Sequence, residues 1–142
     1  MRDLLVDFAA SGRFGPIQLD LSPENVRDLL GEPWREGQGR TGYLIWGYGA
    51  LELYFGRGES SELGVELFRV RFDAHDERLP SLFPQPQPVS FFDFCAAAGK
   101  RGVTVQTDSP LAAEEVRVRV PETGVSAIFT RDALRWIGIG RS

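Results

Sequence analysis

A glycine string and a small acidic cluster are the first features of this sequence that could carry chemistry. The string GQGRTG, at residues 37–42, matches the G-x-G-x-x-G pattern of dinucleotide-binding folds. That chemistry needs a strand before the glycines and a helix after them, because the pyrophosphate rests on the helix N-terminus. Here a loop is predicted before the string and a strand after it. We therefore expect no nucleotide cofactor.

The single histidine, His75, lies beside Asp73, Asp76 and Glu77. Zinc would need three or four ligands at suitable spacing, and consecutive residues at the end of a strand mostly point apart. The cluster is more typical of a charged turn that leaves a strand. We expect no metal site.

Nucleophilic catalysis has no recognisable motif in the chain, which lacks both G-x-S-x-G and H-E-x-x-H. Cys95 lies on the apolar stripe of a predicted helix, where a small buried hydrophobe is more typical than a nucleophile. With one histidine, acid–base chemistry would fall to carboxylates, and no pair of them stands out. The sequence predicts a protein that is not an enzyme.

The charge balance and the apolar segments narrow the partners further. The formal net charge is −4 and the pI is about 5.0, so the chain lacks the basic field that binds nucleic acid. No segment approaches the ~20 apolar residues that cross a bilayer. The first residues read as a short amphipathic helix, because Asp3 and Asp7 interrupt their apolar run. One cysteine cannot form an intrachain disulfide, and we expect a cytoplasmic protein.

Helix and strand signals follow in order through the first half. LSPENVRDLLGEP predicts a helix capped by Ser22, with Pro23 at its first position and Gly31 at its end. EPWREGQGRTG is predicted to be loop. The runs YLIWGY, ALELYF and LGVELFRVRF predict antiparallel strands of a meander.

The second half repeats this order after the proline-rich stretch LPSLFPQPQP, which predicts an extended linker. SFFDFCAAAGKRG predicts a helix capped by Ser90, and GVTVQT, EEVRVRV, GVSAIF and ALRWIGI predict strands. Because YGALELYF can be laid on TGVSAIF, an internal duplication is our hypothesis. The fold class is α+β, with two tandem helix-then-meander units and helices on one face of an antiparallel sheet. The units are residues 1–78 and 89–142, joined by the linker 79–88, and they could form one continuous domain.

The other face of this sheet is the predicted site. Strand alternation places Leu51, Leu53 and Phe55 on the core face, and Glu52 and Tyr54 on the open face. Tyr, Trp and Arg are enriched at protein-binding hot spots. The predicted partner-binding residues are Glu52 and Tyr54, together with four candidates that depend on register: Trp46, Tyr48, Arg69 and Arg71. Tyr43, as the alternative to Tyr48, and Arg117 and Arg119 also depend on register.

The pattern Ser22-x3-Val26-x3-Leu30-Gly31-x-Pro33, followed by a loop and aromatic strands, resembles small bacterial α+β domains of the BamE and β-lactamase-inhibitor-protein type. The inhibitor family has two tandem units of a helical segment and antiparallel strands, and it grips another protein with a concave sheet. The pattern also looks like small acidic immunity proteins of bacterial toxins. The resemblance implies a non-catalytic protein-binding module, an immunity or inhibitor-like protein. The alternatives are a structural homo-oligomeric subunit and a small-molecule-binding or enzymatic domain with a cleft between the halves.

Overall fold

A computed structural model describes residues 1–39, 42–58, 62–73, 76–108 and 114–140. The described residues form three helices and eight strands, which confirms the predicted α+β class. In chain order these are α1 (Arg2–Ser11), α2 (Pro23–Leu30), β1 (Arg35–Gln38), β2 (Leu44–Tyr48), β3 (Leu51–Gly56), β4 (Gly64–Arg71), α3 (Phe91–Lys100), β5 (Gln106–Asp108), β6 (Glu115–Val120), β7 (Val125–Thr130) and β8 (Ala133–Gly140).

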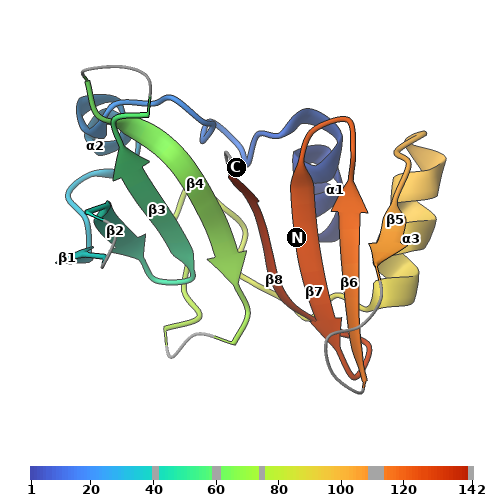
Figure 1. Cartoon of the computed structure of the whole chain (residues 1–142). Coiled ribbons are helices and arrows are strands. Elements are labelled where there is room, and N and C mark those ends of the chain that lie inside the picture. Colours follow the sequence, from blue (N-terminus) through green and yellow to red (C-terminus); the bar gives the residue numbers. More distant parts are fainter. Residues whose placement is uncertain (40–41, 59–61, 74–75, 109–113, 141–142) are drawn as a thin grey trace.

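All eight strands belong to one antiparallel sheet with the order β1-β2-β3-β4-β8-β7-β6-β5. The first half of the described chain contributes two helices and four strands, and the second half one helix and four strands. The last strands of the two halves, β4 and β8, pair with each other. The sheet therefore continues without a break from β1 to β5, as Figure 1 shows.

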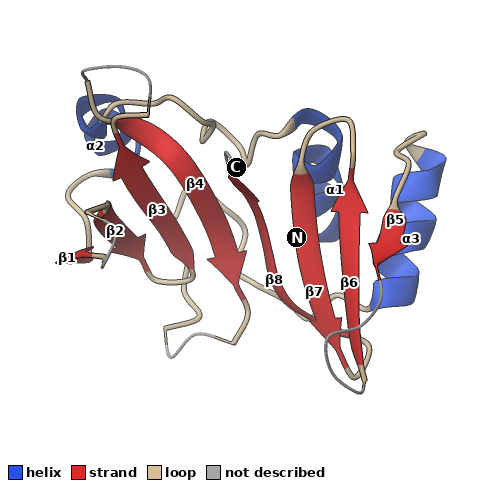
Figure 2. Cartoon of the chain, viewed as in Figure 1, coloured by secondary structure: helices blue, strands red, loops and turns tan. Residues whose placement is uncertain are grey.

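The three helices pack on the same face of this sheet. Phe8 of α1 stacks on Phe68 of β4, with ring centroids 5.2 Å apart. The Arg27 guanidinium of α2 lies 5.0 Å from the centre of the Trp46 ring on β2. On α3, Phe94 packs against Phe129 of β7 at 5.7 Å. Figure 2 shows α1 and α2 behind the strands, so the face toward the viewer is the one opposite the helices.

Serine caps begin two of the helices, as their sequences predict. The Ser22 hydroxyl accepts a hydrogen bond from the backbone N–H of Asn25 at 3.1 Å. The Asn25 side-chain oxygen accepts one from the backbone N–H of Ser22 at 3.4 Å, which completes a capping box. The Ser90 hydroxyl accepts from the N–H of Asp93 at 3.0 Å. These bonds satisfy N–H groups that the first turn of a helix leaves without partners.

A β-bulge interrupts the simple alternation of β4. Tyr54 pairs with Leu67, but the next residue of β3, Phe55, pairs with Val65, so Glu66 is an extra residue. The bulge shifts the phase of the strand by one residue. Val65 and Phe68 are consequently both fully buried although three positions separate them.

A second bulge occupies the matching place in β8. Ile128 of β7 pairs with Trp136, while Phe129 pairs with Leu134, and Arg135 is the extra residue. Leu134 and Ile137 both turn into the core as a result. Trp136 lies on the opposite face.

The proline-rich stretch has no helix or strand, yet it lies against the core. Leu79 and Phe83 are 3% and 5% exposed, and the Phe83 ring stacks on Phe14 at 4.6 Å. Phe14 in turn contacts Phe8 of α1 at 5.8 Å. The stretch therefore crosses the helix side of the sheet as a packed segment.

The first strand corrects the sequence prediction. Residues 35–38 form β1, which was predicted to be loop, and all four of its side chains are exposed. The glycine string at residues 37–42 begins in β1, and its residues 40 and 41 lie outside the described part of the chain. Within the described residues, no helix has the length and apolarity needed to cross a membrane.

Candidate protein-binding face

The open face is the side of the sheet opposite the three helices, and no described helix packs on it. Strand register aligns one residue from each of the eight strands in a row across this face. In sheet order the row is Arg35, Gly47, Glu52, Arg69, Gly138, Ser126, Arg119 and Gln106. Four residues of this row are charged, and three are glycine or serine.

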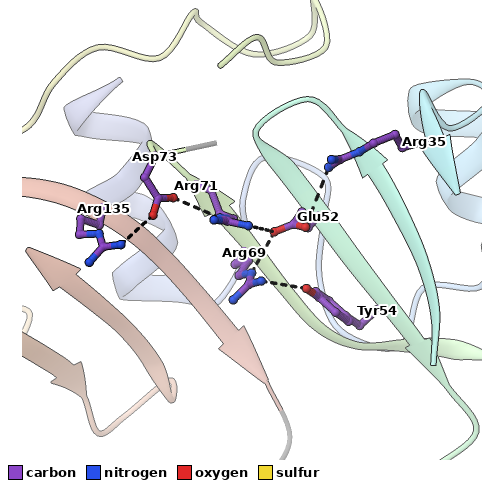
Figure 3. Close-up of polar contacts among 7 residues, drawn as sticks. All are labelled: Arg35, Glu52, Tyr54, Arg69, Arg71, Asp73 and Arg135. Atoms are coloured by element: carbon purple, nitrogen blue, oxygen red, sulfur yellow. Dashed lines mark hydrogen bonds and ion pairs between the residues drawn. The ribbon is translucent and has the colours of Figure 1, made fainter. Parts of the chain in front are cut away.

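Glu52 is the anchor of this row. Glu52 is 9% exposed, and its Oε1 accepts a hydrogen bond from Arg69 Nε at 3.0 Å. Arg71 Nη1 lies 3.6 Å from the same oxygen, and Arg35 Nη2 lies 3.9 Å from Oε2. A carboxylate this buried needs partners to offset its lost hydration, and the arginines supply them. Figure 3 shows these contacts.

Gly47 makes room for one of these arginines. A Cβ atom at this position would lie 2.8 Å from Nε of Arg35. Because glycine has no side chain, the Arg35 guanidinium can lie flat over β2 and reach Glu52 on β3. The glycine of YLIWGY thus has a packing role on the open face.

Tyr54 extends the cluster along β3. Its hydroxyl accepts a hydrogen bond from Arg69 Nη2 at 3.0 Å, and the Arg69 guanidinium lies 5.6 Å from the ring centre. The edge of the Tyr54 ring also meets Tyr43 at 6.5 Å. A hydrogen bond with the Glu66 carboxylate raises the pKa of Tyr43.

Asp73 links the cluster to β8. Its carboxylate accepts hydrogen bonds from Arg71 Nε and from Arg135 Nη2, both at 3.1 Å. Burial raises the pKa of Asp73, but the bonds from Arg71 and Arg135 outweigh burial, and the pKa lies below its usual value. The same contact raises the pKa of Arg71.

We call this set of seven residues the arginine network: Arg35, Glu52, Tyr54, Arg69, Arg71, Asp73 and Arg135 (Figure 3). It contains four cationic and two anionic side chains, so positive charge is in excess. The whole chain has the opposite sign, with a formal net charge of −4. The open face thus presents a local charge that differs from the rest of the surface.

A shallow notch lies beside the network, where β4 and β8 meet. Its lining includes Leu67, Trp136 and the β8 glycines Gly138 and Gly140. The notch has a volume of about 100 Å³ and is bounded on its far side by Ser126. It is a hollow of side-chain size.

The structure brings four of the predicted binding residues together and removes two. Glu52, Tyr54, Arg69 and Arg71 all belong to the arginine network. Placing Trp46 and Tyr48 among open-face candidates was wrong, because they are 2% and 0% exposed on the helix side.

Their neighbours on the helix side explain the burial of these two aromatic residues. Trp46 packs edge-on against Phe55 at 4.9 Å, and the Tyr48 hydroxyl donates to the carbonyl of Gly31 at 2.8 Å. Burial raises the pKa of Tyr48 to about 12. The aromatic side chains of β2 therefore belong to the core, and the candidate site is formed mainly by side chains of the neighbouring strands.

The register-dependent candidates on β6 also lie on the open face. Arg119 shares the row of Glu52, and its Nη2 lies 3.9 Å from Asp108. Arg117 pairs with Ile128, which pairs with Trp136. Neither arginine contacts the network in the described residues.

Metal and thiol chemistry find little support in the described part of the chain. No group of three or more His, Cys, Asp or Glu side chains there could hold a metal ion, and His75 lies outside the described residues. Asp76 pairs with Arg78, whose hydrogen bond lowers the pKa of Asp76 to about 2. Cys95 is half-buried on α3, and burial raises its pKa.

Sequence reasoning missed Arg35, Arg135 and Trp136 as members of the face. Arg35 was read as loop, whereas Arg135 and Trp136 depend on the bulge in β8. The spacing of Leu134 and Ile137, two buried residues three apart in a strand, is the signal that would have placed Trp136 outward. Compared with known family models, curated proteins and solved structures, the chain matches none.

Proposed function

We propose that this chain is a non-catalytic protein-binding module, an immunity or inhibitor-like protein whose partner covers the open face. The arginine network is the observation that carries the proposal. Exposed arginine and tyrosine side chains provide contact area together with hydrogen-bond donors, which is why they are enriched at hot spots. Here they gather on one face of a rigid sheet.

The network also holds its side chains in place before any partner arrives. Arg69 is fixed by Glu52 and Tyr54, and Arg71 by Glu52 and Asp73. An arginine that is already ordered loses less conformational entropy on binding. Less of the free energy of each new contact is therefore offset, and the affinity is higher. This arrangement favours a binding surface over a merely solvated one.

The alternatives find weaker support in the geometry. Between the halves, β4 and β8 pair directly and leave a notch of about 100 Å³, whereas small-molecule sites usually have ~300–1,000 Å³. A larger hollow of about 350 Å³ lies between residues 1–3 and residues 87–93, but its lining is mainly polar, whereas small-molecule sites are mostly apolar. A subunit that assembles through a sheet edge would use β1 or β5. The four exposed residues of β1 include Arg35 and Glu36, and β5 has only three residues; charged or very short edge strands oppose such pairing. The proposed location is the cytoplasm of a bacterium, where a single unpaired cysteine is ordinary.

A photo-crosslinking scan tests the proposal. The photoreactive residue p-benzoylphenylalanine replaces Leu67 or Tyr54 on the open face, and Leu29 or Phe92 on the helix side, in cells that make this protein. Leu29 and Phe92 are 42% and 76% exposed, so they are more accessible than Leu67, which is 37% exposed. We expect one discrete protein adduct from both open-face positions and none from the helix side. Adducts from Leu29 or Phe92, with none from Leu67 and Tyr54, would contradict the proposal.

A further inference from the structure

We infer that the partner segment seated on the open face is acidic and carries an apolar side chain next to its carboxylate. The carboxylate pairs with Arg69 and Arg71, and the apolar side chain enters the notch beside Trp136. This inference rests on the proposed function, because it names the chemistry of the partner at that site. Donor groups, strand register and charge each support it.

The donors are available at the centre of the network. Arg69 uses Nε and Nη2 for Glu52 and Tyr54, and Arg71 uses Nε and Nη1 for Asp73 and Glu52. Within the described residues, Nη1 of Arg69 and Nη2 of Arg71 have no recorded acceptor. Both side chains remain about one-third exposed, at 32% and 34%. Arginine forks of this kind match the geometry of a carboxylate.

Strand register puts the notch within reach of those donors. Arg69 pairs with Gly138, and Arg71 pairs with Trp136, across the β4–β8 junction. A Cβ atom on Gly138 would lie 2.8 Å from Cβ of Arg69, so the glycine is what lets the arginine stand at this crowded position. Trp136 is only partly buried and borders the notch. One peptide segment can therefore place adjacent side chains on the arginines and in the hollow.

The charge of the face decides between possible occupants. A second copy of the chain, placed face to face, would set the positive networks of both copies against each other. Nucleic acid needs an extended basic field, whereas Glu52 and Asp73 interrupt this one and the chain as a whole is acidic. A single carboxylate beside an apolar group satisfies both the local charge and the notch.

The test is a selection of phage-displayed random peptides, twelve residues long, on the intact protein. We expect enrichment of sequences with Asp or Glu beside Leu, Ile or Phe. The best peptide is then measured by fluorescence anisotropy against three variants. Arg71→Gln removes one proposed ion pair, Ser126→Trp fills the notch, and Arg119→Gln is the matched control in the same row outside the network.

We expect Arg71→Gln and Ser126→Trp each to lower the affinity for the peptide by roughly tenfold or more. Arg119→Gln should change this affinity by less than about threefold. Higher salt should weaken binding to the unmodified protein, a readout that needs no variant to fold. Enrichment of basic peptides, no enrichment, insensitivity to both changes, or tighter binding of a twelve-nucleotide single-stranded DNA would overturn the inference.

The two proposals fail in different ways. If crosslinking yields an open-face adduct whose contact peptide is basic, the proposed function stands and this inference is wrong. If acidic peptides are selected and require Arg71, but cellular adducts form at Leu29 or Phe92 and none form at Leu67 and Tyr54, the surface chemistry stands and the proposed function is wrong.

Discussion

Glu52 and Arg69 face each other across β3 and β4, with Arg69 Nε 3.0 Å from Glu52 Oε1, at the centre of the open face. The pair couples fold to function, because the buried carboxylate requires cations and those cations form the proposed binding surface. The consequences for stability and for binding can be separated by substitution.

Glu52→Gln should lower the free energy of unfolding by about 1–3 kcal/mol, because charged hydrogen bonds are lost and the arginines keep their mutual repulsion. Urea denaturation measures the change. Glu122→Gln, at an exposed turn position, is the control and should stay within about 0.5 kcal/mol. Equal effects at the two positions would mean that Glu52 is not structurally required.

Trp46 and Tyr54 should respond differently to truncation, since only the first is core. Trp46→Ala is expected to cost ~3–5 kcal/mol of folding free energy, the usual cost of a deleted buried aromatic side chain. Tyr54→Ala should cost about 1 kcal/mol, mainly its hydrogen bond with Arg69. Thermal unfolding of the two variants gives the comparison. A smaller loss of folding free energy for Trp46→Ala than for Tyr54→Ala would show that β2 is misassigned.

The helix caps offer a paired test of local structure. Ser22→Ala and Ser90→Ala should each destabilise the protein by about 1 kcal/mol, as the loss of an N-cap usually does. The caps belong to different helices, so their effects should add. Ser81→Ala, at an exposed position in the proline-rich stretch, is expected to have no measurable effect. Chemical denaturation of the single and double variants decides.

Phe83 tests whether the proline-rich stretch is linker or core. Phe83→Ala should destabilise the protein by ~3–5 kcal/mol, because its ring stacks on Phe14. Its neighbour Leu82 is 56% exposed, and Leu82→Ala should change stability by less than about 0.5 kcal/mol. If the two variants unfold at the same denaturant concentration, the stretch does not contribute to the core.

The raised pKa of Tyr48 predicts a stability loss in alkali. A tyrosine whose pKa rises on folding, here from 10.0 to about 12, favours the neutral phenol in the folded state. Its contribution is complete below pH 10 and is lost as the pH rises toward 12. Denaturation series from pH 8 to pH 11.5 should show a smaller loss for Tyr48→Phe than for the unmodified protein. An equal loss of stability in the Tyr48→Phe variant and in the unmodified protein would contradict the proposed effect of Tyr48 burial.

Much of the framework could be predicted from the sequence because the signals were local. Ser22, Pro23 and Gly31 mark one helix, Ser90 marks another, and strand alternation in ALELYF places Glu52 and Tyr54 correctly on the open face. The structure confirms both helices and the placement of these two side chains. The internal duplication remains a hypothesis: both halves contain a helix followed by four strands and a bulge in the last strand, but the first half has a further helix, α1.

Other features depend on contacts between distant segments, which local patterns do not encode. The charged strand β1 exists because it pairs with β2, and the β8 bulge decides the direction of Trp136. Trp46 and Tyr48 were misplaced because glycine and aromatic residues in YLIWGY give no clear alternation. Asp73 bonds to Arg71 within the same segment, but it reaches Arg135 only because β4 and β8 meet.

The most direct test of the binding face is the affinity of the crosslinked partner for two aromatic variants, measured by isothermal titration calorimetry. Tyr54 lies in the arginine network, and Phe92 is an aromatic residue 76% exposed on α3. Our account predicts that Tyr54→Ala weakens binding by about 2 kcal/mol or more, with the fold intact, and that Phe92→Ala leaves it unchanged. Unchanged affinity for Tyr54→Ala, with a loss for Phe92→Ala, would contradict it.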